Sequence, residues 1–199
     1  MTRLGLLGGT FDPPHYGHLV AAQEAAWQLH LERVLFLPAH QNPLKQDEPS
    51  TPADLRCEMV ARAIADNPQF ALSRADLDRP PPSYTAELLR QLQHPDRELF
   101  WLVGADILPE LPRWYRPTEI LRLSRLVVVN RPESPLPDLA ALEAALPGAR
   151  ERVDLVFSPG VAISARNLRA RVAAGQPIRY LTPPSVEQFI REKGLYQPG

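Results

Sequence analysis

The chain has 199 residues, 44% of them hydrophobic, and its 22 basic residues nearly balance its 23 acidic ones. A chain of this length can bury roughly 70% of its unfolded surface, so it needs no disulfides, and its single cysteine fits a reducing compartment. The balanced charge argues against nucleic-acid and membrane partners, and no run reaches the roughly 20 apolar residues that span a bilayer, so we expect a cytoplasmic protein.

Strand-like apolar runs alternate with helix-like segments along the chain. The sequence predicts, in order, strand 3–7, helix 16–30, strand 33–37, helix 53–65, strand 70–73, helix 83–93, strands 99–103 and 126–129, helix 139–146, strand 153–157, and helices 167–174 and 183–193. Apolar runs without polar alternation are typical of strands covered on both faces in a parallel sheet. We therefore predict an α/β fold, Rossmann-like and doubly wound, with a mostly parallel sheet. Residues 1–199 are expected to form a single domain, in which about 164–199 make a small C-terminal helical portion.

Some local features are predicted from the same patterns. Ser83 or Thr85 can cap the helix predicted at 83–93. The proline-flanked segment 112–117 is expected to be a loop. Cys57 lies in a helical pattern, where a small buried hydrophobe is a better interpretation than a redox or nucleophilic group.

The turn after the first predicted strand, GGTFDPPHYGH at residues 8–18, carries the clearest functional pattern. Its two glycines let backbone N–H groups approach a phosphate or a base closely. The two prolines place the start of the helix near His15, so that His15 and His18 share one helix face. A helix N-terminus favours an anion, and two imidazoles there can donate hydrogen bonds to phosphate oxygens. In the alternative interpretation, one histidine caps the helix and the other packs.

A second polar pattern, ISARNLR at residues 163–169, precedes a predicted helix. Ser164 can cap this helix and present its hydroxyl to a phosphate, and the guanidinium of Arg169 matches phosphate oxygens. The alternative is an ordinary capped helix with a solvated arginine face.

The middle of the chain adds two patterns. Asp106, in the run Gly104-Ala105-Asp106 at the end of strand 99–103, can accept hydrogen bonds from ribose hydroxyls or cap the next helix. The segments Pro82–Thr85 and Trp114-Tyr115 offer aromatic surface on which a flat heterocycle can stack, and backbone N–H groups near Thr85 and Tyr115 can receive a carboxylate. The alternative for the tryptophan is packing in the core.

The run GGTFDPPHYGH resembles the signature of the HxGH nucleotidyltransferase superfamily. Within it, the run is most similar to the family of bacterial nicotinate-nucleotide adenylyltransferases, whose motif reads GGTFDP-x-H-x-GH. The run at 163–169 resembles that family's second signature, with Arg166 where the family usually has Thr or Ser. The resemblance extends from Leu4 to Tyr196. It implies an enzyme of NAD biosynthesis that transfers AMP from ATP to nicotinate mononucleotide and releases deamido-NAD and pyrophosphate.

The resemblance also implies roles for individual residues. The catalytic residues are His15, His18 and Arg169. The residues implied to bind ATP are Gly8, Gly9, Thr10, Phe11, Lys45, Gly104, Asp106, Ile163 and Ser164. The residues implied to bind the nicotinate substrate are Tyr84, Thr85, Trp114 and Tyr115. Lys45 corresponds to the basic end of a family loop, P-P-H-[KR], in which Leu44 replaces the usual histidine.

The nucleophile of this reaction is an ionised phosphate, so catalysis needs positioning and charge stabilisation and no general base. The expected cofactor is Mg²⁺ held mainly through the ATP phosphates, with no metal site built from protein side chains. The expected partners are ATP and nicotinate mononucleotide, and the sequence is compatible with a homo-oligomer.

The sequence alone leaves other functions open. The acceptor can instead be phosphopantetheine or nicotinamide mononucleotide. The chain can also be a nucleotide-binding regulatory module without turnover. RNA binding is the weakest alternative, because no basic stripe is present.

Overall fold

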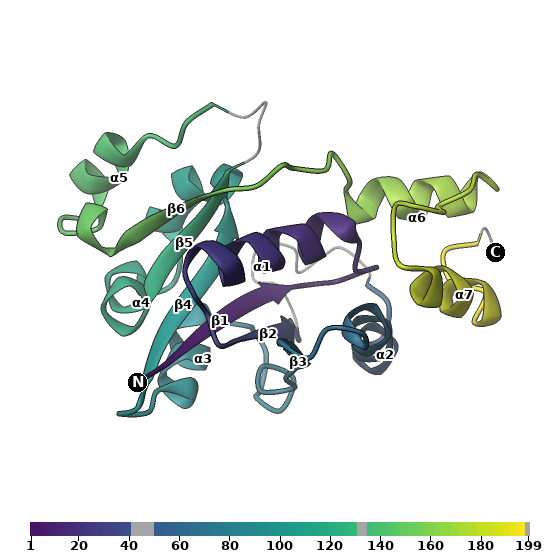
Figure 1. The fold of residues 1–199 in the computed structure, drawn as a ribbon, viewed down its shortest axis with the longest axis horizontal. Coiled ribbons are helices and arrows are strands. Elements are labelled where there is room, and N and C mark those ends of the chain that lie inside the picture. The colour runs from purple at the N-terminus through teal and green to yellow at the C-terminus, as the bar shows by residue number, and fades with distance from the viewer. Residues whose placement is uncertain (41–49, 131–134, 198–199) are drawn as a thin grey trace.

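The computed structural model describes residues 1–40, 50–130 and 135–197. Within these ranges the chain forms a six-stranded sheet with the order β3-β2-β1-β4-β5-β6, in which all paired strands are parallel (Figure 1). The strands are β1 (Thr2–Gly9), β2 (Arg33–Pro38), β3 (Phe70–Leu72), β4 (Arg97–Gly104), β5 (Arg125–Asn130) and β6 (Val153–Phe157). The predicted doubly wound α/β fold is therefore confirmed.

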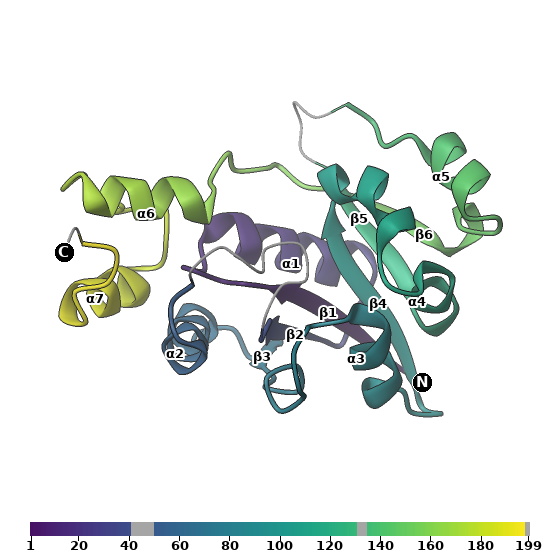
Figure 2. The same ribbon diagram turned by 180° about the vertical axis from the view of Figure 1, so that it is seen from behind.

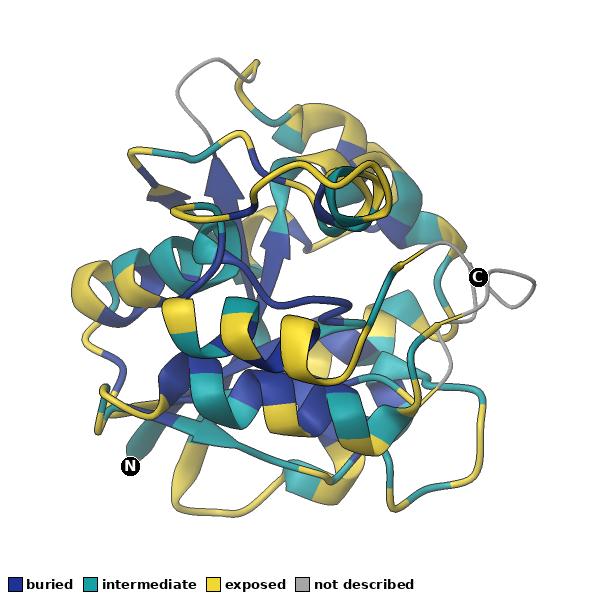
Figure 3. Ribbon diagram, turned by 90° about the vertical axis from the view of Figure 1, so that its right-hand side faces the viewer, coloured by how far each residue is buried: buried dark blue, intermediate teal, exposed yellow. Residues whose placement is uncertain are grey.

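Helices cover both faces of the sheet (Figures 1 and 2). One hydrophobic cluster joins the sheet to α1 (Tyr16–Gln28), α2 (Ala53–Ile64), α6 (Ala165–Ala173) and α7 (Pro184–Glu192). The other cluster joins it to α3 (Thr85–Leu92), the 3₁₀ helix η1 (Ala105–Arg113), α4 (Pro117–Leu123) and α5 (Leu139–Ala145). A short 3₁₀ turn, η2 (Arg150–Arg152), leads into β6. Figure 3 shows the strands buried beneath helices whose outward turns are exposed.

Strand residues divide between the two faces because successive side chains of a strand point in opposite directions. Phe100 and Leu102 of β4 belong to the α1 cluster, whereas Leu99 and Trp101 belong to the α3 cluster. Both faces of the central strands are thus apolar, which explains the absence of polar alternation in their sequences. The predicted C-terminal helical portion corresponds to α6 and α7, which lie together at one end of the molecule, with α7 packed on α2 (Figure 1).

The strand order reverses between β1 and β4. From β1 the chain runs outward through β2 and β3, and it then returns to β4 on the other side of β1. Leu7 pairs with Leu102, so the loops that follow β1 and β4 leave the same edge of the sheet. Ligands of doubly wound folds bind in the crevice at this kind of reversal.

Some local predictions were wrong. The proline-flanked segment 112–117 is not one loop, because η1 extends to Arg113 and α4 begins at Pro117. Proline is tolerated at the first position of a helix, where no backbone N–H is needed. The N-cap position of α3 is occupied by Tyr84, which makes no capping side-chain hydrogen bond, so neither Ser83 nor Thr85 holds that position. Cys57 is buried, as expected for a packing residue, and burial raises the pKa of its thiol.

No helix in the described part of the chain is both long and apolar enough to cross a membrane.

Candidate active site

Two pockets open at the edge of the sheet where the strands end. The larger pocket, of about 880 Å³, lies between the turn after β1, the ends of β4 and β5, and the start of α6. The smaller pocket, of about 400 Å³, lies between the end of β1, Trp101 of β4, the start of α3 and the η1–α4 junction. Ala39, which directly follows β2, lines both pockets. The two pockets therefore share a wall.

The turn after β1 is anchored by Phe11. This residue is 2% exposed and has a φ of 51°, a left-handed conformation that is uncommon for a side chain of this size. Its ring packs against Phe36, with 5.8 Å between centroids, and meets the ring of His18 edge-on at 5.0 Å. Phe11 thus connects the core of the fold to the larger pocket.

His15 and His18 stack in the wall of the larger pocket, with 3.7 Å between their ring centroids. His15 is the N-cap residue of α1, and its backbone N–H donates to Nδ1 of His18 over 3.2 Å. Because Nδ1 of His18 is an acceptor, a neutral His18 carries its proton on Nε2. His15 is only 4% exposed, yet it lines the pocket. The two rings lie together, but His15 precedes the helix with an extended backbone, so the prediction that both residues share a helix face was wrong in detail. His15 combines the N-cap position with a place in the pocket wall.

The N-terminus of α6 forms the opposite wall of the larger pocket. Ser164 is the N-cap residue, and its Oγ accepts a hydrogen bond from the backbone N–H of Asn167 over 3.2 Å, so the predicted cap is confirmed. Nη1 of Arg169 donates to the backbone carbonyl of Asp12 over 2.7 Å. Ile163 and Arg166 also line this pocket. Two sequence patterns 157 residues apart are therefore joined directly by a hydrogen bond.

The end of β4 contributes Gly104 and Asp106 to the larger pocket. The N-cap residue of η1 is Gly104, so Asp106 does not cap that helix. A Cβ atom at Gly104 would overlap Oδ1 of Asp106, so the carboxylate would have to move away. The absence of a side chain at Gly104 therefore allows the carboxylate of Asp106 to fold back beside the pocket.

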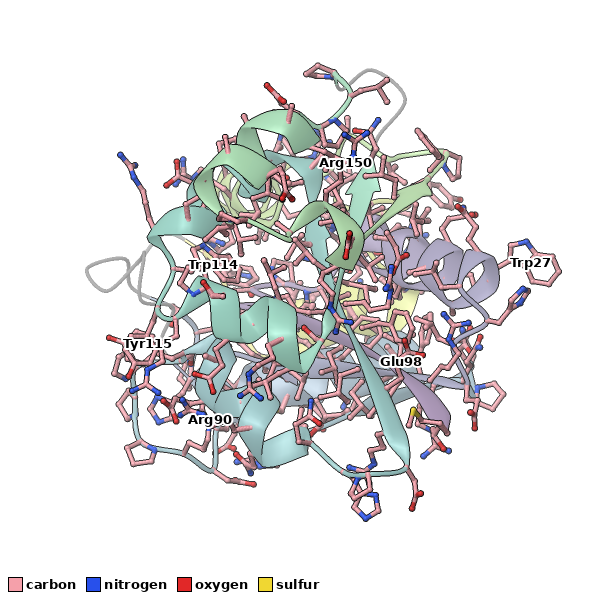
Figure 4. All side chains as sticks on the ribbon, turned by 90° about the vertical axis from the view of Figure 1, so that its left-hand side faces the viewer. Trp27, Arg90, Glu98, Trp114, Tyr115 and Arg150 are labelled. Carbon is pink, nitrogen blue, oxygen red and sulfur yellow. The ribbon has the colours of Figure 1, made fainter. Side chains whose placement is uncertain are left out.

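The smaller pocket is largely aromatic. The rings of Tyr84 and Tyr115 pack at a tilt, with 4.5 Å between their centroids, and Thr85 and Trp114 lie beside them in the pocket wall. The guanidinium of Arg116 lies over the ring of Tyr115 at 5.0 Å. Trp114 and Tyr115 occupy one side of the molecule, whereas Trp27 projects from the opposite side (Figure 4). The aromatic segments singled out in the sequence thus meet in one pocket.

The glycines of the first motif do not all face the same pocket. Thr10 and Phe11 line the larger pocket, whereas Gly8 and Gly9 line the smaller one. A Cβ atom at Gly8 would lie 2.6 Å from Cη2 of Trp101, so the indole ring packs directly on the glycine backbone. Gly8 and Gly9, grouped in the sequence with the nucleotide-binding residues, are therefore also next to the aromatic pocket.

Several pocket residues were missed in the sequence. Arg56 and Asp12 are almost fully buried and line the larger pocket, and Asp76 and Trp101 line the smaller one. The one available signal was a single arginine among the apolar positions of helix 53–65, and Trp101 was hidden inside an apolar strand. Lys45 lies outside the described residues. Within the described ranges, no three His, Cys, Asp or Glu side chains form a group that could hold a metal ion.

The chain is similar in sequence and in fold to known proteins. Residues 6–171 match the family model described as cytidylyltransferase-like. The chain is 47% identical over 195 residues to a protein of Roseiflexus sp. (strain RS-1) named "Probable nicotinate-nucleotide adenylyltransferase", with 98% of each chain covered. It is 46% identical over 199 residues to a protein of the same name from Thermomicrobium roseum, covering 99% of this chain and 92% of the relative.

A solved structure shares the fold. The Plasmodium falciparum nicotinic acid mononucleotide adenylyltransferase, complexed with NaAD, is similar with a TM-score of 0.81 at 16% sequence identity. The match covers 98% of each chain.

Proposed function

Because the chain belongs to the nicotinate-nucleotide adenylyltransferase family, it is an enzyme that transfers AMP from ATP to nicotinate mononucleotide in NAD biosynthesis, and we propose that its two pockets divide the two substrates. The larger pocket holds ATP. The smaller pocket holds the nicotinate ring of the acceptor. Their shared wall brings the acceptor phosphate to the α-phosphorus of ATP.

The observation that supports this division is the meeting of the two polar patterns across the larger pocket. His15 and His18 lie on one side, Ser164 and Arg169 lie on the other, and Arg169 is tied to the carbonyl of Asp12. Hydrogen-bond donors and a guanidinium at two helix N-termini suit a chain of phosphates. The aromatic smaller pocket suits a planar ring instead.

His18 is the central group in the proposed mechanism. Its Nδ1 accepts from the backbone N–H of His15, so a neutral His18 carries its proton on Nε2, and we propose that this N–H donates to a phosphate oxygen when ATP is bound. The 5′-phosphate of the acceptor attacks the α-phosphorus in line, and pyrophosphate leaves. Negative charge moves toward the leaving group during this step, and a fixed donor stabilises it without reorganisation. No residue has to remove a proton from the nucleophile.

Arg169 and Ser164 act on the pyrophosphate side in this proposal. Nη1 of Arg169 donates to the backbone carbonyl of Asp12. This bond orients the guanidinium so that its other N–H groups can contact phosphate oxygens. Ser164 places the N-terminus of α6 at the pocket, where free backbone N–H groups attract an anion. His15 stacks on His18 and fixes the plane of the catalytic ring.

A divalent cation, which we take to be Mg²⁺, fits this pocket as a partner of ATP. Of the carboxylates that line the described part of the larger pocket, Asp12 is already an acceptor for Tyr196 Oη and for the backbone N–H of Thr51. Asp106 is thus the more available carboxylate, and one carboxylate suits an ion that keeps mainly phosphate and water ligands. When bound, the ion neutralises part of the charge on the phosphates.

The experiment that tests the function is pyrophosphate release from Mg·ATP with a panel of acceptors. We expect turnover with nicotinate mononucleotide and much slower or no turnover with nicotinamide mononucleotide, with phosphopantetheine and without an acceptor. Equal rates with all acceptors would remove the smaller pocket from substrate selection. ATP binding without pyrophosphate release with any acceptor would favour a regulatory module.

The reducing compartment suggested by the single cysteine supports a cytoplasmic location, which is part of this proposal.

A further inference from the structure

Among the residues that the structure describes, Arg56 is the most deeply buried charged side chain that lines either pocket. It projects from the first turns of α2, and only 2% of its surface is exposed. Burying a guanidinium is costly unless its N–H groups are paired. Those pairs come from three separate segments of chain at the edge of the sheet.

The hydrogen bonds of Arg56 all go to backbone carbonyls. Nη1 donates to Thr10 over 2.8 Å, Nη2 to Ala39 over 2.9 Å, and Nε to Thr51 over 2.9 Å. Thr10 follows β1, Ala39 follows β2, and Thr51 precedes α2. The planar fork of an arginine can hold three carbonyls in fixed directions, which the single nitrogen of a lysine cannot do.

Two buried aspartates support the same segments. Oδ2 of Asp76 accepts from the backbone N–H of His40, whose peptide group also contains the carbonyl of Ala39 bound by Arg56. One peptide group is therefore held at its oxygen by an arginine and at its nitrogen by a carboxylate. Oδ2 of Asp12 likewise accepts from the backbone N–H of Thr51. Burial lowers the pKa of Arg56, and the nearby negative charge of Asp12 opposes that shift.

The held segments are the ones that shape the reaction site. The peptide group of Ala39 and His40 belongs to the wall that separates the two pockets. The carbonyl of Thr10 directly precedes Phe11, whose left-handed backbone places its ring against His18. A shift at Arg56 would thus move both the wall between the substrates and the imidazole that faces ATP.

We infer that Arg56 is a positioning residue for the transfer reaction: through three backbone carbonyls it fixes the wall shared by the pockets and the turn that orients His18. This inference rests on the proposed function. Arg56 contributes no group to the reacting atoms in this role. Its contribution is geometric, and a displacement of about 1 Å in a reacting centre can lower a rate by about 10²-fold.

The test is the Arg56→Lys variant, which keeps the positive charge and the helical position but cannot bind three carbonyls together. Kinetics are measured well below the variant's own unfolding midpoint, so that all of the enzyme is folded. We expect kcat with ATP and nicotinate mononucleotide to fall about 10²-fold. The binding of ATP alone, measured by calorimetry, is expected to change no more than about threefold, because the phosphate-binding groups themselves are retained.

Arg62→Lys is the matched control. Arg62 lies on the same helix, is partly exposed, and pairs with Glu58 over 2.7 Å at a site that lines neither pocket. Its kcat should equal that of the wild type. An inactive wild type would contradict the proposed function, whereas an active wild type beside a fully active Arg56→Lys would overturn the positioning role alone.

Two further readouts separate positioning from a purely structural role. Guanidinium ion at a low, non-denaturing concentration should restore part of the kcat of Arg56→Ala, whereas ammonium at the same ionic strength should not. Asp76→Asn, which alters the other end of the same peptide group, should lower kcat about threefold to tenfold in the folded enzyme. If the kcat of the Arg56 variants returns to the wild-type value on cooling, or if these variants have no cooperative unfolding transition, Arg56 serves only the fold and the inference is wrong.

Discussion

The two pockets are built in different ways. The larger pocket is assembled around short, nearly contiguous patterns: residues 8–18 at one end of the chain and residues 163–169 at the other. Its polar groups stand at helix starts, where backbone geometry directs them. The smaller pocket is assembled from single aromatic residues on β4, α3 and the η1–α4 junction. Its shape depends on packing between elements that are distant in sequence.

This difference matches a proposed division of roles: the larger pocket supports catalysis, and the smaller pocket selects the acceptor. The groups proposed to stabilise charge stand at helix starts and act in the transition state, so losing one of them should lower kcat. The groups proposed to select the acceptor act by surface contact that is equal in the ground and transition states, so losing one of them should raise KM. The predictions that follow test this division.

The largest expected effect is on turnover. In His18→Ala, the Nε2 donor in the larger pocket is lost, and kcat should fall by roughly two to three powers of ten, as for the loss of one transition-state donor. KM for the acceptor should change little. Pyrophosphate release at saturating substrates measures both values.

The matched control for this prediction is His94→Ala. His94 is more than half exposed and lies beside Asp96 before β4, away from both pockets. Its kcat should equal that of the wild type. A near-wild-type rate in His18→Ala would remove His18 from the mechanism.

A smaller effect is expected in the aromatic pocket. Stacking of a flat ring on an aromatic side chain contributes about 1–3 kcal/mol, so Trp114→Ala should raise KM for nicotinate mononucleotide roughly tenfold to a hundredfold. Its kcat and its KM for ATP should stay close to wild type. Trp27→Ala is the control, since Trp27 is 74% exposed and projects from the opposite side (Figure 4). A fall in kcat alone would contradict the division between the pockets.

The next prediction concerns a residue of the glycine motif. Gly8→Ala places a methyl group 2.6 Å from Cη2 of Trp101 and forces the indole to shift within the smaller pocket. Overpacking of this kind costs about 1–3 kcal/mol, and we expect KM for the acceptor to rise several-fold. KM for ATP should change less. If only KM for ATP rises, Gly8 serves the nucleotide, as the motif alone suggests.

Much of the fold, and the residues that line the candidate site, could be predicted from the sequence. The strands buried on both faces were visible in the sequence as uninterrupted apolar runs. The strand order, and with it the reversal between β1 and β4, came only from the structure. Each predicted site residue in the described ranges lines one of the two pockets. Proline and glycine near His15, and serine at position 164, marked helix starts by rules that depend only on local geometry.

The residues and elements that the sequence did not reveal depend on tertiary contacts. Arg56 lies in a helix whose sequence does not reveal which carbonyls its side chain reaches, and those carbonyls come from three other segments. The assignment of Gly8 to the smaller pocket depends on the ring of Trp101, which packs on the glycine backbone. Trp101 is far from Gly8 in the sequence and lies on the neighbouring strand β4, paired with Leu6, so no sequence pattern connects the two residues. The 3₁₀ helix η1 was hidden because Pro109 and Pro112 lie inside it.

The last prediction concerns Tyr196, where we expect a loss of stability and the smallest effect on turnover. Tyr196 lines neither pocket, but it is hydrogen-bonded to the turn after β1. Its hydroxyl donates to Oδ1 of Asp12 over 2.5 Å. Burial and this neighbouring carboxylate raise the pKa of Tyr196 above its usual value near 10. Because the protonated form is favoured in the folded state, its contribution to stability is complete below about pH 10 and is lost as the pH rises toward the raised pKa.

Tyr196→Phe should therefore lower the free energy of unfolding by about 1.5–3 kcal/mol at pH 7, because a hydrogen bond to a charged group is removed. The difference from wild type should narrow above pH 10, where wild-type folding is opposed by ionisation of Tyr196 in the unfolded chain. Urea unfolding at pH 7 and pH 10.5 measures both differences, and Tyr180→Phe, at a tyrosine that is 85% exposed, is the control. Equal differences at the two pH values would mean that the hydroxyl of Tyr196 is not held in its protonated form by Asp12. A kcat that falls as far as in His18→Ala would instead place the Tyr196–Asp12 contact within the catalytic machinery.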